Sequence, residues 1–420
     1  MSKPVNISPA LSDVRYEIRG ALANRAQELE RQGYEITKLN IGNPGQFGFR
    51  TPETMRLAMI ENMRSSEAYC HQKGIFPARE AVVMQQQSRG VQGVSAEHVF
   101  IGNGVSELID LTLRALLAPG DEVLVPAPDY PLWTAATLLN GGVAKHYPCL
   151  PEEHFIPRIE DIEANITNKT RAIVVINPNN PTGAVYPESV LRGIVELAER
   201  YGLVIMSDEI YDQMLYEEAV HIPMATLVNS GVCITYSGLS KVYRACGYRV
   251  GWAVVSGDVE SAGDYMHALE LLASLRLCAN VPAQWSVQTA LGGYQSIHEL
   301  TKPTGRLFES RAAIIAAVNS SEYLNLVEPN GSMYAFVGVN TDVIPAFNDY
   351  EFALELLENQ HVLLAPGGSF NVPYSNHFRI TLLPRAGALA EIFERIETQL
   401  VHTAAQGPKL KRVNRPSSND

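Results

Sequence analysis

Residues 171–208 read RAIVVINPNNPTGAVYPESVLRGIVELAERYGLVIMSD, and the order of their segments decides the fold. A continuous apolar run, Arg171–Ile176, is followed by the turn-forming segment Asn177–Gly183 and then by the amphipathic segment Ser189–Tyr201. A second apolar run, Leu203–Met206, comes next. Apolar runs without alternation indicate strands that are buried on both faces, as in a mostly parallel sheet. This stretch therefore predicts a strand–helix–strand unit of an α/β fold.

The same alternation of strands and helices extends on both sides of this unit. Further strands are predicted at Glu122–Val125, Val232–Tyr236 and Arg249–Val255, and a further helix at Ser106–Leu117. We therefore expect a doubly wound α/β domain whose ligand crevice lies at the carboxyl ends of the strands.

The pattern changes after about residue 300, where longer helices alternate with short strands and predict a smaller α+β unit. The predicted helices lie at about 303–318, 350–358 and 386–400, and the predicted strands at 324–328, 332–337 and 378–382. We expect four parts along the chain: an N-terminal arm (1–45) that packs on the small domain, a large domain (46–300), a small C-terminal domain (301–402) and a disordered basic tail (403–420).

Composition and charge argue against several classes of protein. The chain has 420 residues, and its 33 basic and 45 acidic side chains give a formal net charge of −12, which disfavours nucleic acid and anionic membranes as partners. No apolar run approaches the roughly 18 residues of a membrane span, and no signal peptide is evident, so a cytoplasmic protein is expected. The five cysteines form no CxxC pair and the histidines are scattered, so we expect neither a disulfide framework nor a metal site.

Polar and glycine-rich segments follow the predicted strands and would converge on one crevice: Gly102–Ser106, Asn180, Asp208, Tyr211, Lys241 and Arg249. A lysine in a crevice can form a Schiff base with an aldehyde, and a buried carboxylate can keep a heteroaromatic nitrogen protonated. A helix N-terminus with a nearby arginine binds phosphate. Together these groups describe a pyridoxal phosphate site.

These residues also carry a family resemblance. The segment Gly238–Gly251, GLSKVYRACGYRVG, is similar to the lysine signature of the class I, fold-type I aminotransferases, and the resemblance covers about residues 6–400. Four stretches resemble the bacterial glutamate–pyruvate (alanine) aminotransferases: APDYPLW (127–133), SGLSKVYRACGYR (237–249), LASLRLCANVPAQ (272–284) and HFRI (377–380).

The resemblance implies a three-layer α/β fold, in which a large domain is built on a mostly parallel sheet of the seven-stranded type and a smaller domain is α+β. It implies pyridoxal 5′-phosphate as cofactor and a homodimer with shared active sites. The implied reaction is transamination between an amino acid and a 2-oxo acid, specifically L-alanine plus 2-oxoglutarate giving pyruvate plus L-glutamate.

Residue roles follow from the same resemblance. Lys241 would be the Schiff-base lysine and would move the substrate's α-proton, while Asp208 would pair with the pyridine nitrogen. Tyr211 and Asn180 would bind the cofactor's phenolic oxygen, and Tyr130 would stack on its ring. Asp208 could instead cap a helix, Tyr130 could be a core aromatic, and Asn180 could also be a turn former.

The remaining implied roles concern phosphate and substrate. The implied phosphate ligands are Gly104, Val105, Ser106, Arg249, either Ser237 or Ser240, and Tyr69 of the partner subunit. Arg379 and Gly42 would bind the substrate's α-carboxylate together with Asn180, and Tyr16 would lie in a segment that closes over the substrate. Arg276 could bind the distal carboxylate of glutamate, although a structural ion pair is the favoured interpretation.

Several other functions stay open at this point. The sequence does not rank alanine against valine, 2-aminobutyrate or aromatic substrates, because one methylene changes binding by only about 1–3 kcal/mol in such pockets. A β-lyase or decarboxylase on the same fold keeps the cofactor but breaks a different bond. A regulatory protein that binds pyridoxal phosphate without catalysis is the alternative from another class.

Overall fold

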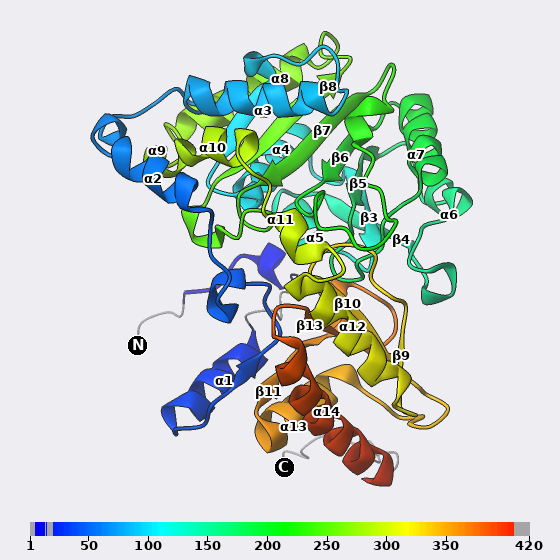
Figure 1. Ribbon diagram of the computed structural model, residues 1–420. Coiled ribbons are helices and arrows are strands. Elements are labelled where there is room, and N and C mark those ends of the chain that lie inside the picture. Colours follow the sequence, from blue (N-terminus) through cyan, green and yellow to red (C-terminus); the bar gives the residue numbers. More distant parts are fainter. Residues whose placement is uncertain (1–4, 13, 15–19, 407–420) are drawn as a thin grey trace.

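The computed structural model describes residues 5–12, 14 and 20–406, and its largest element is a seven-stranded sheet in the order β2-β8-β7-β6-β5-β3-β4 (Figure 1). The strands are β2 (Val99–Gly102), β3 (Glu122–Ala127), β4 (Val143–Pro148), β5 (Thr170–Ile176), β6 (Val204–Asp208), β7 (Val232–Gly238) and β8 (Gly251–Gly257). Neighbouring strands pair in parallel, except that β8 is antiparallel to both β7 and β2. The predicted mostly parallel α/β sheet is thus confirmed.

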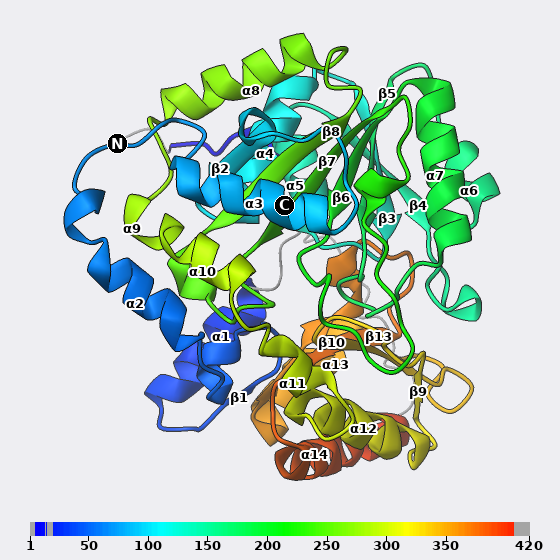
Figure 2. The same cartoon turned by 45° about the horizontal axis from the view of Figure 1, so that its top comes forward.

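Helices cover both faces of this sheet and give the molecule three layers here (Figure 2). One face carries α4 (Val105–Leu116), α5 (Leu132–Leu139) and α8 (Gly263–Leu275), and the other carries α3 (Phe76–Ser88) and α7 (Glu188–Tyr201). In β5, Val174 and Ile176 pack with the first group, whereas Ile173 and Val175 pack with the second. Because both faces are buried, β5 is apolar from Ala172 to Ile176.

The predicted helices 106–117 and 189–201 agree with α4 and α7 to within one residue at each end. One prediction is wrong, because Arg249 does not open the next strand. It precedes β8 and has φ 52°, a left-handed conformation that a strand residue does not adopt. The strand instead begins at Gly251, where a side chain would collide with the backbone nitrogen of Val105.

A second sheet, antiparallel and four-stranded, is formed by the later part of the chain in the order β12-β13-β10-β9. Its strands are β9 (Leu324–Leu326), β10 (Tyr334–Val339), β12 (Ala365–Pro366) and β13 (His377–Thr381), and its helices are α12 (Arg306–Asn319), α13 (Asp349–Gln360) and α14 (Ala386–Gln406). The N-terminal helix α1 (Ala21–Arg31) lies beside α13, and β1 (Thr37–Lys38) pairs with β11 (Val362–Leu363). The division into four parts at residues 45, 300 and 402 stays a prediction.

Shorter elements connect these units. The remaining α-helices are α2 (Glu53–Glu61), α6 (Ile159–Glu163), α9 (Val281–Gln284), α10 (Ser286–Gly292) and α11 (Ile297–Thr301), and the 3-10 turns used below are η8 (Cys246–Tyr248) and η9 (Gly367–Phe370). None of the helices in the described part of the chain has both the length and the apolar character needed to cross a bilayer. Residues 407–420, most of the tail predicted to be disordered, lie outside the described residues.

Candidate active site

A cavity of about 690 Å³ lies where the carboxyl ends of the parallel strands β5 and β6 face the second sheet. Many of the residues that the sequence singled out line it: Gly42, Val105, Ser106, Tyr130, Asn180, Asp208, Tyr211, Ser240, Lys241, Arg249 and Arg379. The carboxyl ends of parallel strands are the usual place for a ligand in a doubly wound fold, so the predicted position of the crevice agrees with the observed one.

Lys241 lies in the loop after β7 and directs its amine into the cavity. Its Nζ donates a hydrogen bond to the carbonyl oxygen of Gly42, at 2.8 Å. Gly238 lies three residues before the lysine. A side chain at Gly238 would lie 2.7 Å from the carbonyl oxygen of Val250, so the close approach of β7 and β8 requires glycine.

Asp208 is the last residue of β6 and is buried at the bottom of the cavity. Its Oδ2 accepts a hydrogen bond from Trp133 Nε1 at 3.2 Å, and its Oδ1 accepts one from the backbone of Ile210 at 3.3 Å. Burial raises the pKa of Asp208 to about 6, although the hydrogen bonds and the charge of Lys241 act in the opposite direction. A buried carboxyl group that lacks a bonded cation favours a ligand with a protonated nitrogen.

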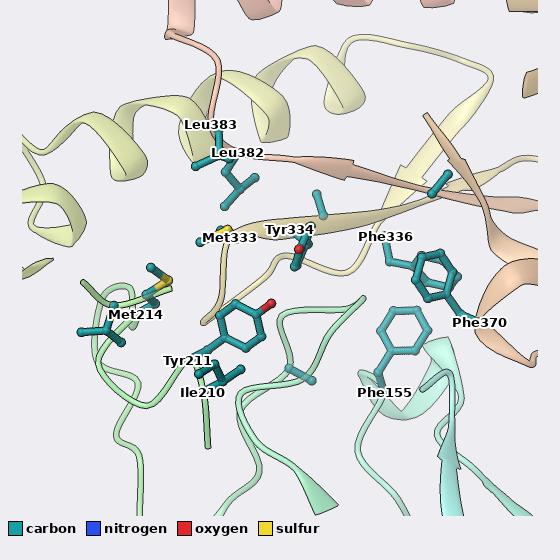
Figure 3. Close-up of a cluster of buried hydrophobic side chains, with 14 of the residues drawn as sticks. Phe155, Ile210, Tyr211, Met214, Met333, Tyr334, Phe336, Phe370, Leu382 and Leu383 are labelled. Carbon is teal, nitrogen blue, oxygen red and sulfur yellow. The ribbon is translucent and has the colours of Figure 1, made fainter. Parts of the chain in front are cut away.

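Tyr211 is also buried, and it faces a tyrosine that the sequence analysis did not identify. Tyr334, the first residue of β10, packs edge-on against Tyr211 with ring centroids 6.0 Å apart (Figure 3). Burial raises the pKa of Tyr211. Burial also raises the pKa of Tyr334, but the positive charges of Lys241 and Arg379 outweigh that effect and hold its pKa below the ordinary value. Both tyrosines line the cavity.

Arg379 lies on β13 and is only 1% exposed. Its Nη1 donates to Asn180 Oδ1 at 2.8 Å, and its Nη2 donates to the carbonyl oxygen of Asn40. The guanidinium lies 4.1 Å from the ring of Tyr334, and its Nε is buried without a hydrogen-bond partner among the described residues. Because both of its bonded acceptors are uncharged oxygens, the buried cation is prepared to bind a ligand carboxylate.

The cavity is also lined by Val105 and Ser106 of the first turn of helix α4, which together with Arg249 form a candidate anion site. Helix α4 begins after Gly104, which has φ 91° and, as a glycine, has no side chain that could cap the first N–H groups of the helix. Arg249 lies so close that any side chain at Gly104 would overlap its guanidinium. Its Nη1 donates to the carbonyl oxygen of Cys246 at 2.8 Å. Free helix N–H groups beside a guanidinium bind phosphate.

Some of the predicted residues are not at the cavity in this chain. Ser237 is buried in β7, so of the two candidate serines only Ser240 lines the cavity. Tyr69 is 79% exposed, and Arg276 donates to the carbonyl oxygen of Ile101 at 2.8 Å. Tyr16 lies outside the described residues.

Sequence reasoning missed several lining residues, namely Ile41, Asn43, Ile176, Ile210, Cys246, Gly247 and Tyr334. Most of them are near neighbours, in sequence, of residues that were identified. Tyr334 is different, because an aromatic residue in an apolar strand is typical of a core and gives no local signal of a site.

The comparisons with known proteins agree with this geometry. The family model for aminotransferase class I and II matches residues 34–396. The chain is 47% identical over 382 residues to the glutamate-pyruvate aminotransferase AlaA of Escherichia coli K12, an alignment that covers 91% of this chain and 94% of that protein. It is 44% identical over 395 residues to the alanine aminotransferase of Mycobacterium tuberculosis H37Rv, covering 94% and 92% of the two chains.

Solved structures give the same result. An aminotransferase from Escherichia coli superposes with a TM-score of 0.93 at 45% identity, covering 97% of this chain and all of that one. The alanine aminotransferase of Pyrococcus furiosus superposes with a TM-score of 0.89 at 36% identity, covering 94% of this chain and all of that one. The chain therefore belongs to the class I and II aminotransferase family.

Proposed function

We propose that the protein is a pyridoxal 5′-phosphate-dependent transaminase that converts L-alanine and 2-oxoglutarate to pyruvate and L-glutamate. The observation that carries the proposal is a single cavity that holds the amine of Lys241 and the buried guanidinium of Arg379. The printed names of the relatives, glutamate-pyruvate aminotransferase and alanine aminotransferase, supply the substrate pair.

The residues present fit the cofactor. Lys241 would hold its aldehyde carbon, Asp208 its ring nitrogen and Tyr211 its phenolic oxygen. The first turn of α4 and Arg249 would hold its phosphate, since glycine at position 104 leaves room for a close approach. When bound, pyridoxal phosphate supplies an electron sink that stabilises negative charge on the substrate's α-carbon.

The chain itself supplies orientation and proton transfer. Arg379 would bind the α-carboxylate through two hydrogen bonds. Asn180 and Asn40 hold its guanidinium in place, and its Nε has no hydrogen-bond partner among the described residues. This grip would set which bond of the α-carbon is broken. Nζ of Lys241 would take the α-proton and deliver it to the carbon that was the cofactor's aldehyde carbon, acting as a general base and then as a general acid.

Steady-state kinetics test the reaction. With alanine and 2-oxoglutarate varied together, we expect parallel lines in double-reciprocal plots, equal amounts of pyruvate and glutamate, and no free ammonia. If activity is higher with valine, 2-aminobutyrate or an aromatic amino acid than with alanine, that amino acid and not alanine is the preferred donor. Release of ammonia without a 2-oxo acid acceptor would point to a lyase.

We also propose that the enzyme is a homodimer in the cytoplasm. Tyr69 is exposed, as expected of a side chain that reaches a partner's phosphate site. Large apolar side chains are exposed on α2 and α8 and in the residues that follow these helices: Leu57, Ile60, Met63, Leu271, Leu275 and Leu277. Exposed apolar patches of this kind favour a protein interface. The five cysteines are free thiols, which suits a reducing compartment.

A further inference from the structure

Arg249 is held from outside the cavity by two asparagines. Asn280, the residue before α9, donates from Nδ2 to the carbonyl oxygen of Arg249 at 3.0 Å. The same Nδ2 and the backbone nitrogen of Asn280 donate to Asn103 Oδ1, at 3.1 and 2.9 Å. Nη2 of Arg249 donates to the carbonyl oxygen of Asn103 at 3.3 Å, which closes a ring of contacts around the arginine.

The backbone of Arg249 needs such support. Its φ of 52° is left-handed, a conformation that disfavours residues with a long side chain. Conformations of this kind persist where the surrounding structure over-determines them. The amide of Asn280 binds the carbonyl group of this residue directly, so it stabilises the turn that points the guanidinium at the first turn of α4.

Asn103 extends the same network into α4. Its backbone nitrogen and its Nδ2 donate to the two carboxylate oxygens of Glu107, at 2.7 and 3.0 Å. A carboxylate on the first turn of a helix would repel an anion bound there. Arg276 offsets this charge, because its Nε lies 3.6 Å from Glu107 Oε2 while its Nη2 is fixed by Ile101.

We propose that Asn280 and Asn103 are positioning residues for the phosphate of the cofactor, and that they hold Arg249 and the start of α4 in one fixed arrangement. Neither asparagine lines the cavity, so both act through their neighbours. Arg276 belongs to this network as the counter-charge of Glu107. The inference rests on the proposed function, because the anion concerned is the phosphate of the proposed cofactor.

The test is the variant Asn280→Ser in the full-length protein. Asn280 Oδ1 caps α9 by accepting from the backbone of Ala283, and serine is an equally good cap that adds no charge. Serine, however, lacks the amide that reaches Arg249. We expect the affinity of the cofactor-free protein for pyridoxal phosphate to fall about tenfold, as for the loss of a hydrogen bond at a charged site. Its affinity for pyridoxal, which has no phosphate, should not change.

Matched variants make the result specific. Asn140→Ser removes an amide that also donates two hydrogen bonds, to Asp110 and Ala136, and both affinities should stay at the wild-type value. Asn103→Ala should reproduce the effect of Asn280→Ser, and the double variant should lose no more than either single one, because the two residues act as a unit.

Two results would overturn the proposal. An equal loss of affinity for pyridoxal phosphate and pyridoxal would show a purely structural role, and an unchanged affinity for both would show no role. A wild-type protein that binds neither compound would overturn the proposed function itself, which separates the two failures.

Discussion

At the residue scale, the proposed reaction depends most directly on Lys241, which would bind the cofactor and transfer the α-proton. We expect Lys241→Ala to abolish turnover and to remove the visible absorbance of lysine-bound cofactor, because no other amine is placed at the cavity among the described lining residues. Lys169→Ala, at an exposed position, is the matched control and should keep full activity. Activity near the wild-type level in Lys241→Ala would refute its role.

Arg379 sets the affinity for substrate in this account. A lysine at this position keeps the positive charge but loses the planar guanidinium that can donate two parallel hydrogen bonds. Charge-assisted hydrogen bonds contribute roughly 1.5–3 kcal/mol. We therefore expect Arg379→Lys to lower kcat/KM for alanine about 100-fold. Cofactor affinity, measured by absorbance titration, should change little. Unchanged kcat/KM in the variant would show that the carboxylate binds elsewhere.

At the residue scale, the sequence predicted the site best where the signal was local. Asp208 ends the strand β6 and Lys241 comes three residues after β7, so their position at strand ends could be read directly from the sequence. Arg379 was identified by its motif alone. Tyr334 was missed, because its place beside Tyr211 depends on pairing between β10 and β13, where Tyr334 lies opposite Thr381. Such long-range pairing leaves no local trace in the sequence.

At the scale of elements, the loop after β3 is tied to η9 through Asp129. This buried carboxyl group accepts hydrogen bonds from Thr134 Oγ1 at 2.6 Å and Asn371 Nδ2 at 2.8 Å. Burial raises the pKa of Asp129 to about 7, from an ordinary value of 3.8. His146 Nε2 lies 4.0 Å from Asp129 Oδ2, and burial lowers the pKa of this imidazole.

The folded state therefore binds more protons at Asp129 than the unfolded state between about pH 4 and pH 7. We expect this residue to make the free energy of unfolding fall as pH rises through that window and to add no slope above it. Asp129→Asn should flatten the profile measured by urea denaturation of the cofactor-free protein. Asp208, with a pKa of about 6, adds a slope of the same sign that the variant keeps. Identical profiles would contradict this assignment.

The elements themselves were largely predictable, with exceptions that have physical causes. The continuous apolar runs of β5 and β6 indicated strands buried on both faces, and both faces are buried. The start of β8 was placed too early, because a left-handed backbone at Arg249 is not visible in an apolar pattern. Asn280 gave no signal either, since its function lies in contacts with residues distant in sequence.

At the scale of the whole molecule, the proposed homodimer is tested through the apolar side chains that a single chain leaves exposed. Leu275 is 74% exposed at the end of α8, one helical turn after the exposed Leu271. We expect Leu275→Glu to lower the molecular mass measured by sedimentation from twice 46.1 kDa toward that of the monomer. Activity should fall in parallel. Leu139→Glu, at an exposed leucine that ends α5, is the control. A fully active monomer would contradict shared active sites.

A half-reaction shows whether this chain transfers the amino group of alanine to its own cofactor. The protein, loaded with pyridoxal phosphate and freed of 2-oxo acids, is mixed with L-alanine alone while the spectrum and pyruvate are measured. The account predicts loss of the lysine-bound absorbance and one pyruvate per active site, with no free ammonia. An absorbance that does not respond to alanine, or pyruvate formed continuously with ammonia, would contradict it.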